Sequence, residues 1–275
     1  MHPVLFHIGP ILVPAYGVMA AVGVLLALTL LLHTARSVGL NPNQLWNLCI
    51  IALLGALAGS RILLLVLNWT AMRTHPAWLL GLAMVHHPLL AGAGAAFALV
   101  AAVPYARWLH LPLRPAADAL AAPLALALAC EQVGALLSGT GFGTETTARW
   151  AIVYTHPLAA RWSGAPLFVP VHPVQAYSAF AFLAIAIALF LWMPHRRQMG
   201  EVAGIGLLCT GVAIYFTEFL RDLEGRGSIF NGLLDGPQVA AIGLVLIGAL
   251  ALRQRENAHI AASLAPDQST EAQHV

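Results

Sequence analysis

Seven long apolar runs follow one another along this chain of 275 residues. Each run is close to the ~20 residues that an α-helix needs to cross a bilayer. The runs lie at about 15–33, 46–67, 89–105, 115–138, 174–194, 201–220 and 237–252. Stretches rich in polar residues, glycine or proline separate them. The pattern predicts an all-α membrane protein built as a seven-transmembrane-helix bundle.

Composition supports this prediction. Hydrophobic residues make up 60% of the chain and charged residues 9%, whereas about 25% of a soluble domain is charged. No basic stripe is visible, which gives no case for a nucleic-acid partner. The three cysteines fall in different apolar runs, so no disulfide framework is expected. We expect neither a metal site nor a cofactor.

The distribution of arginine predicts the orientation. The short loops that would face the cytoplasm carry Arg36, Arg107, Arg114, Arg196 and Arg197. Short cytoplasmic loops are enriched in basic residues. We therefore expect the N-terminus outside and the C-terminus inside.

Residues 1–253 are predicted to form one membrane domain, followed by a disordered cytoplasmic tail at 254–275 because that segment is polar. Two outer segments are longer than a bundle needs. The segment 69–88 is expected to form a short interfacial helix. The segment 139–173 is expected to form a small head with a strand around 150–154, and long loops of this kind often carry function.

Arg61 lies about two-thirds of the way through the second predicted span, and Glu131 about two-thirds of the way through the fourth. A lone charge at the bilayer centre costs at least ~2.5 kcal/mol on insertion scales. Both residues should lie at similar depth, so we expect an Arg61–Glu131 pair, or both groups lining one wet cavity. Such a pair could be a strut between two helices or part of a site for a lipid headgroup.

Glu131 also begins the most polar stretch of the predicted core. This stretch contains Gln132, Gly134, Ser138, Gly139, Thr140, Gly141 and Gly143. Polar side chains at these positions cannot all face lipid. The stretch is either one wall of a site near the outer leaflet or a helix end that unwinds into a glycine-rich loop.

Two further polar clusters are expected at the same outer level. His172, Gln175 and Tyr177 surround the start of the fifth span, and the i, i+3 spacing of His172 and Gln175 predicts a shared helix face. Glu218 and Arg221 end the sixth span and can pair locally. Each cluster could line the site or serve only as an anchor. His86 and His87 could carry protons or form half of a metal site, but adjacent histidines point in different directions on a helix.

Taken in order, these motifs resemble the bacterial prolipoprotein diacylglyceryl transferase family. The matching stretches are Ile8-Gly9-Pro10 with Tyr16-Gly17, Gly59-Ser60-Arg61-Ile62, Asp118 fourteen residues before Gln132, His172-Pro173-x-Gln175-x-Tyr177, Glu218-Phe219-x-Arg221 and Gly236-Pro237-Gln238. The resemblance runs through nearly all of the chain.

The chain departs from the family inside its central motif, which reads roughly GRxGNFxNxExxG. The glycines remain at Gly134 and Gly143, but Gln132 stands at the position of the arginine and Thr140 at that of the glutamate. The two asparagine positions hold Ala135 and Ser138. A family histidine falls near Gly92, and an arginine of the sixth helix is Ile214.

The resemblance implies that a diacylglyceryl group moves from phosphatidylglycerol to the lipobox cysteine of a preprotein, in the bacterial cytoplasmic membrane. Membrane phospholipid and lipobox-containing preproteins would be the partners, and the chain would be a monomer. Candidate catalytic residues are Glu131, Gln132 and His172. Candidate lipid- or substrate-binding residues are Tyr16, Arg61, Gln132, Gly134, Ser138, Gly139, Thr140, Gly143, Gln175, Tyr177, Glu218 and Arg221. The alternative is a catalytically inactive paralogue that binds phospholipid or a preprolipoprotein.

Overall fold

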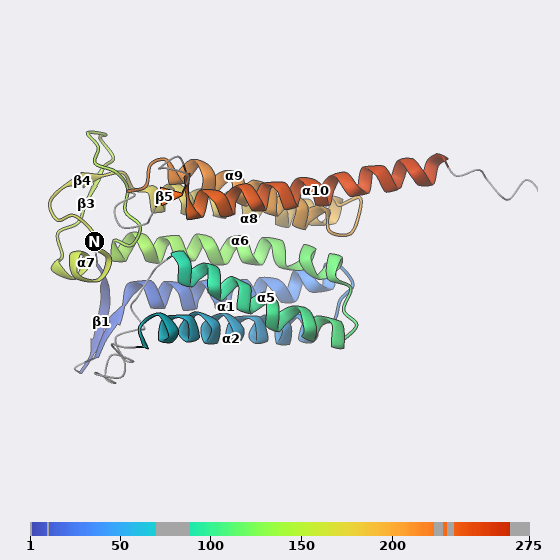
Figure 1. The fold of residues 1–275 in the computed structure, drawn as a ribbon, viewed down its shortest axis with the longest axis horizontal. Coiled ribbons are helices and arrows are strands. Elements are labelled where there is room, and N and C mark those ends of the chain that lie inside the picture. Colours follow the sequence, from blue (N-terminus) through green and yellow to red (C-terminus); the bar gives the residue numbers. More distant parts are fainter. Residues whose placement is uncertain (1, 10, 70–87, 223–227, 230–233, 265–275) are drawn as a thin grey trace, which may run out of the picture.

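The computed structural model describes residues 2–9, 11–69, 88–222, 228–229 and 234–264. Long helices lie side by side along one direction (Figure 1). They are α1 (Ala15–Ser37), α2 (Pro42–Leu67), α5 (Pro88–Trp108), α6 (Leu113–Ser138), α8 (Val174–Trp192), α9 (Glu201–Glu218) and α10 (Gly236–Leu264). The all-helical architecture expected from the apolar runs is therefore present.

Within the described part of the chain, six helices are long and apolar enough to cross a membrane: α1, α2, α6, α8, α9 and the Gly236–Arg253 part of α10. Many large apolar side chains lie on the bundle surface; Val100 and Phe180, for example, are 69% and 73% exposed. Such an apolar surface is suited to contact with the hydrocarbon tails of membrane lipids. The span expected at 89–105 coincides with α5, which is not among the six, so a seventh crossing stays a prediction.

Small residues bring the helices together. Helix α1 packs on α6, α2 on α5, α6 on α8, and α9 on α10. A Cβ atom at Gly211 of α9 would lie 2.6 Å from the carbonyl oxygen of Ala241 in α10. At Gly59 of α2 a Cβ would collide with the ring of Phe97 in α5. Close backbone approach of this kind is how helices associate in lipid, where hydrocarbon gives no hydrophobic drive between them.

Asp118 fixes the start of α9 against α6. Its carboxylate is fully buried and accepts hydrogen bonds from the backbone N–H groups of Gly200 and Ala203, the latter at 2.9 Å. A carboxylate at a helix N-terminus satisfies amides that have no partner within the helix. Asp118, which matched a family position in the sequence, therefore has a structural role at the end of the bundle far from the head.

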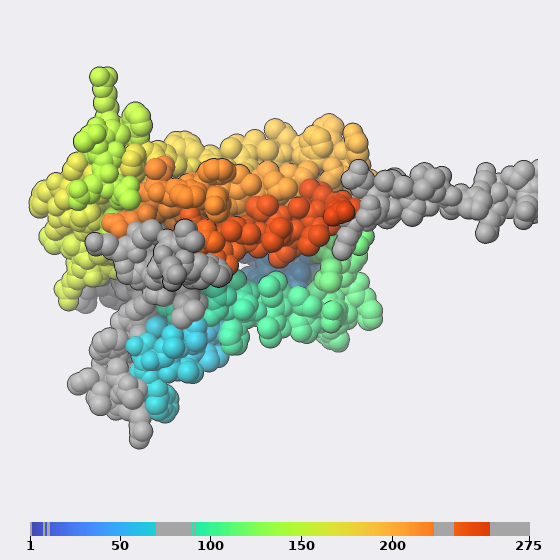
Figure 2. Space-filling model, turned by 45° about the horizontal axis from the view of Figure 1, so that its top comes forward, coloured from blue at the N-terminus to red at the C-terminus, as the bar shows by residue number. Residues whose placement is uncertain are grey.

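Short strands and one short helix gather at the other end of the bundle, called here the head end (Figure 1). Strands β1 (Val4–Ile8) and β2 (Ile11–Pro14) form an antiparallel hairpin directly before α1. Strands β3 (Ile152–Val153) and β4 (Pro170–Val171) pair within the head segment, which also contains α7 (Pro157–Ser163). A third pair is formed by β5 (Ser228–Ile229) and β6 (Leu234–Asp235). The head segment protrudes beyond the helix ends (Figure 2).

The predictions for the segments outside the bundle are confirmed only in part. Strand β3 lies inside the stretch where a strand was expected, whereas the N-terminal hairpin was not predicted. The interfacial helix expected at 69–88, with His86 and His87, falls almost wholly outside the described residues. The backbone of α10 continues as helix to Leu264, beyond residue 253 where a disordered tail was expected to begin.

Candidate functional site

A carboxylate on α6 forms the centre of the first polar cluster. Glu131 accepts a hydrogen bond at its Oε1 from the hydroxyl of Tyr16 on α1, at 2.8 Å. Its Oε2 accepts a second one from Nε2 of Gln132, at 2.6 Å. All three side chains are half-buried. Because Glu131 lies seven residues before Ser138, where α6 ends, it is ~10 Å inside the apolar zone at a rise of ~1.5 Å per residue.

Gly134 allows this contact between α1 and α6. A Cβ there would lie 2.9 Å from Cβ of Met19 and 3.2 Å from the backbone of Tyr16. Any larger residue would push α1 away and separate the Tyr16 hydroxyl from Glu131. Gly134 was expected to line a site, and the structure gives it the role of holding the site's two helices together.

The expected direct ion pair between Arg61 and Glu131 is not formed. Among the described residues the recorded ion pair joins Glu218 and Arg221, and the Glu131 carboxylate is engaged by Tyr16 and Gln132. Helix α1 packs on both α2 and α6, the two helices that carry these charges. Arg61 has other interactions of its own. That both groups line one wet cavity stays a prediction.

A second group of candidates fixes the chain where α6 ends. Gly139 takes φ = 84° as the C-cap of α6, a left-handed conformation that suits glycine. The hydroxyls of Ser138, Thr140 and Ser163 are linked in sequence, each 3.0 Å from the next. Ser138 is buried, and its Oγ also donates to the Ala135 carbonyl. This network ties α6 to α7, so these hydroxyls help to hold the head in place.

Gln175 on α8 completes this network. The hydrogen-bonded group of Ser138, Thr140, Ser163, Tyr154 and Gln175 is called here the anchor of the head. The Gln175 side chain is fully buried and donates from Nε2 to the Thr140 carbonyl oxygen at 3.0 Å and to the Tyr154 hydroxyl at 3.3 Å. Tyr154 in turn donates to the carbonyl oxygen of Leu136. Burial raises the pKa of the Tyr154 hydroxyl to about 12, with the hydrogen bond from Gln175 opposing the shift. The hydroxyl therefore keeps its proton, and its donor role, at all ordinary pH values.

Replacing Gln175 with leucine should destabilise the head and the bundle by about 1–3 kcal/mol, because it leaves buried polar groups without partners. Thermal unfolding in detergent measures the effect. Gln44→Leu on α2, where no side-chain hydrogen bond is recorded in the described structure, is the matched control and should change little. If Gln175→Leu left the unfolding temperature unchanged and impaired lipid binding instead, Gln175 would belong to the site.

The third group meets at Gly143. A Cβ at this position would collide with the carbonyl oxygen and Cβ of His172, and Gly143 pairs as an isolated bridge with Arg221. Backbone hydrogen bonds extend the junction: Thr144 N donates to the Leu220 carbonyl, and His172 N donates to the Thr144 carbonyl. The end of α9, the head segment and the start of α8 are therefore joined around one glycine.

His172 lies beside Tyr177 in this junction. Its Nδ1 is 3.4 Å from the Tyr177 hydroxyl, which accepts a 2.6 Å hydrogen bond from Nε1 of Trp150. The expected shared helix face of His172 and Gln175 was wrong, because α8 begins at Val174 and leaves His172 in the preceding loop. Gln175 points into the anchor and His172 toward Tyr177.

Glu218 and Arg221 form the local pair that their spacing predicted. The Arg221 Nε lies 3.2 Å from Oε2 of Glu218, and both side chains are nearly buried, with exposures of 11% and 5%. Each has further interactions. The pair joins the end of α9 to the junction at Gly143, and breaking a buried pair by removing one partner leaves an uncompensated charge.

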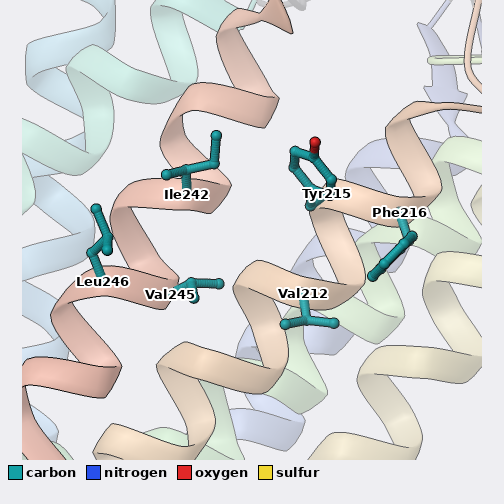
Figure 3. A pocket seen from close by; sticks show the side chains of 6 residues that line it. All are labelled: Val212, Tyr215, Phe216, Ile242, Val245 and Leu246. Carbon is teal, nitrogen blue, oxygen red and sulfur yellow. The ribbon is translucent and has the colours of Figure 1, made fainter.

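A shallow apolar groove lies on the membrane side of this junction, between α9 and α10 (Figure 3). Its volume is about 250 Å³. It is lined by Val212, Tyr215, Phe216, Ile242, Val245 and Leu246. The lining suits hydrocarbon and offers no acid, base or cation to a reacting group.

Sequence reasoning missed three residues that organise the head: Trp150, Tyr154 and Ser163. Each depends on a partner far away in the chain, so no local pattern could have identified it. The signal available was the aromatic content of the head segment. Among the described residues, no group of three or more His, Cys, Asp or Glu side chains is arranged to hold a metal ion.

Of the three groups, the Tyr16–Glu131–Gln132 cluster lies between the membrane-spanning helices α1 and α6 rather than in the head. It has a carboxylate that lies within the apolar zone and is only half-buried. A charged group at that depth must meet water or a polar ligand. The cluster can accept a proton and can hydrogen-bond a polar headgroup.

Comparison with known proteins places this geometry in context. The model of the family described as prolipoprotein diacylglyceryl transferase matches residues 3–253. Phosphatidylglycerol--prolipoprotein diacylglyceryl transferase 2 of Clostridium perfringens is 28% identical over 92% of this chain and 94% of its own length. The relatives named phosphatidylglycerol--prolipoprotein diacylglyceryl transferase include that of Vibrio cholerae, at 28% identity over 90% of this chain and 89% of its own. That of Trichormus variabilis is 29% identical over 91% and 88%.

Proposed function

We propose, since the chain belongs to the prolipoprotein diacylglyceryl transferase family, that it transfers a diacylglyceryl group from phosphatidylglycerol to the lipobox cysteine of a preprotein. The relatives' names supply the substrates. The multi-pass helical structure and the bacterial relatives support a place in the cytoplasmic membrane. The observation that carries the proposal is the half-buried carboxylate of Glu131 between α1 and α6.

The chemistry needs a thiolate, because a cysteine thiol with a pKa of ~8.5 is mostly protonated at neutral pH and only the thiolate is a good nucleophile. In the proposed reaction Glu131 takes the thiol proton. The cysteine sulfur then forms a bond to the terminal glyceryl carbon of the lipid. The bond from that carbon to the phosphate oxygen breaks, and glycerol phosphate leaves with the electron pair.

Tyr16 and Gln132 act as positioning residues for this base. Their hydrogen bonds hold both carboxylate oxygens, which fixes the direction in which the remaining lone pairs point. Arg61, on the head-end half of α2 and half-buried, is the proposed cation for the lipid phosphate. It lies six residues before the end of its helix, ~9 Å inside the apolar zone at the helical rise, a depth similar to that of Glu131.

The test is a transfer assay with the full chain. Purified protein in phosphatidylglycerol liposomes is incubated with a lipobox peptide, and the peptide mass is read by mass spectrometry. The expected result is a gain of one diacylglyceryl group that depends on the peptide cysteine. A protein that gives no gain, beside one of the named relatives as an active control, would refute transfer as its function.

A second function has one specific observation in its favour. Gln132 stands where the family motif places an arginine, and a neutral amide cannot balance a phosphate charge. Removing one preorganised stabilising donor costs ~10²–10³ in rate in other enzymes. A chain that binds phospholipid or a preprolipoprotein without transferring the group would retain lipid binding in the same preparation that shows no mass gain.

A further inference from the structure

One buried atom in the central cluster has no hydrogen-bond partner. Oε1 of Gln132 is shielded from solvent and receives no hydrogen bond. Leaving a buried acceptor unpaired costs ~1–3 kcal/mol. The Tyr16 hydroxyl and the Gln132 amide nitrogen both donate hydrogen bonds to the Glu131 carboxylate. The unpaired atom therefore marks a place where a ligand could supply a hydrogen.

The neighbouring carboxylate fixes the direction of this amide. The Nε2 of Gln132 lies 2.6 Å from Oε2 of Glu131. An ionised carboxylate only accepts hydrogen bonds. Turning the amide around would place Oε1 against Oε2, two acceptors at hydrogen-bonding distance. Gln132 therefore donates toward Glu131 and presents an acceptor on its other side.

An acceptor selects a different ligand group from the one that an arginine selects. A guanidinium has only donors and matches the oxygens of a phosphate. The Gln132 oxygen and the Glu131 carboxylate would both repel phosphate oxygens. Both would accept a hydrogen from an alcohol, and a polyol headgroup carries such hydrogens.

We infer that the Glu131–Gln132 pair binds the hydroxyl groups of a lipid's polyol headgroup and leaves its phosphate to another residue. This inference rests on the proposed function, because it takes phosphatidylglycerol, whose headgroup is a diol, as the substrate. It assigns to Gln132 the role of a hydrogen-bond acceptor for the headgroup hydroxyls, a role that an arginine, which has only donors, cannot take.

The test compares two lipids that differ only in these hydroxyls. Phosphatidylglycerol and phosphatidylpropanol with identical acyl chains carry the same phosphodiester and the same charge. Each is titrated into the full-length protein in detergent, and binding is followed by native mass spectrometry. We expect phosphatidylglycerol to bind about tenfold more tightly, since a site built to accept a hydroxyl proton rejects an analogue that lacks it.

Gln132→Leu should reduce this ratio to about one and leave the affinity for phosphatidylpropanol nearly unchanged. The matched control Gln44→Leu on α2 should keep the tenfold ratio. Equal affinity of the wild-type protein for the two lipids would overturn the inference without any variant, as would a full ratio in a folded Gln132→Leu protein. Tighter binding of phosphatidylethanolamine than of phosphatidylglycerol would also overturn it, because the acceptor would then serve an ammonium group.

The result can be separated from the transfer assay. Binding is measured without peptide and without turnover. A protein that discriminates between the lipids and transfers nothing would refute the proposed reaction and support the headgroup assignment. A protein that transfers the diacylglyceryl group equally well from both lipids would support the proposed reaction and refute the headgroup assignment.

Discussion

Replacing Glu131 with glutamine is expected to lower the rate of diacylglyceryl transfer by about 10²–10⁴-fold, the usual contribution of a positioned general base. The fold should survive. The new amide still offers an oxygen to the Tyr16 hydroxyl, and Gln132 can turn its own amide to meet the amide nitrogen at position 131. Initial rates of peptide lipidation, with unfolding temperature measured in parallel, separate loss of chemistry from loss of structure.

Glu145→Gln is the matched control for this change. Glu145 is an exposed carboxylate in the head segment. Its replacement by glutamine removes one negative charge, as Glu131→Gln does. Its variant should retain the wild-type rate within about twofold, since exposed substitutions away from a site usually have small effects. A Glu131→Gln protein that is folded and fully active would remove Glu131 from the mechanism.

Replacing Arg61 with alanine is expected to weaken phosphatidylglycerol binding by a factor of ten to a hundred or more. A hydrogen bond to a charged group contributes ~1.5–3 kcal/mol, and 1.4 kcal/mol corresponds to tenfold. The phosphate of the lipid would lose its proposed cation within the apolar zone, where no water replaces it fully. Native mass spectrometry with the purified variant measures the loss directly.

Two further variants define what Arg61 does. Arg114→Ala removes an exposed arginine at the start of α6, at the end of the bundle away from the head, and should leave binding intact. Arg61→Lys keeps the charge but not the planar fork, so it should recover part of the affinity. Unchanged lipid binding in a folded Arg61→Ala protein would discard the phosphate role and leave Arg61 as a structural strut.

Most of the candidate residues that sequence reasoning identified are found in three groups of contacting side chains. Tyr16, Glu131 and Gln132 meet within the membrane zone. Gln175, expected near a ligand, is buried in the anchor of the head. Helical spacing could place these residues on spans and rank their depth, because depth follows from 1.5 Å per residue. Helical spacing does not predict the direction of a side chain outside a helix. The shared face expected for His172 and Gln175 was wrong for this reason, because His172 lies before the start of α8.

The amino-acid sequence by itself determined that this protein lies in a lipid bilayer, and it determined the order of the helices. The reason is that runs of about 20 apolar residues with few charges are stable as membrane-spanning helices. The sequence also carried the family motifs and the polar residues that had to find partners.

The tertiary structure alone decided which partners those are. Glycines at 134 and 143 permit two close approaches, and the packing of α1 on α6 places the Tyr16 hydroxyl within hydrogen-bonding distance of the Glu131 carboxylate. The physical reason is that a hydrogen bond depends on distances of about 3 Å between side chains that can be a hundred residues apart. Such distances are set by how helices pack, and no local pattern in a sequence encodes them.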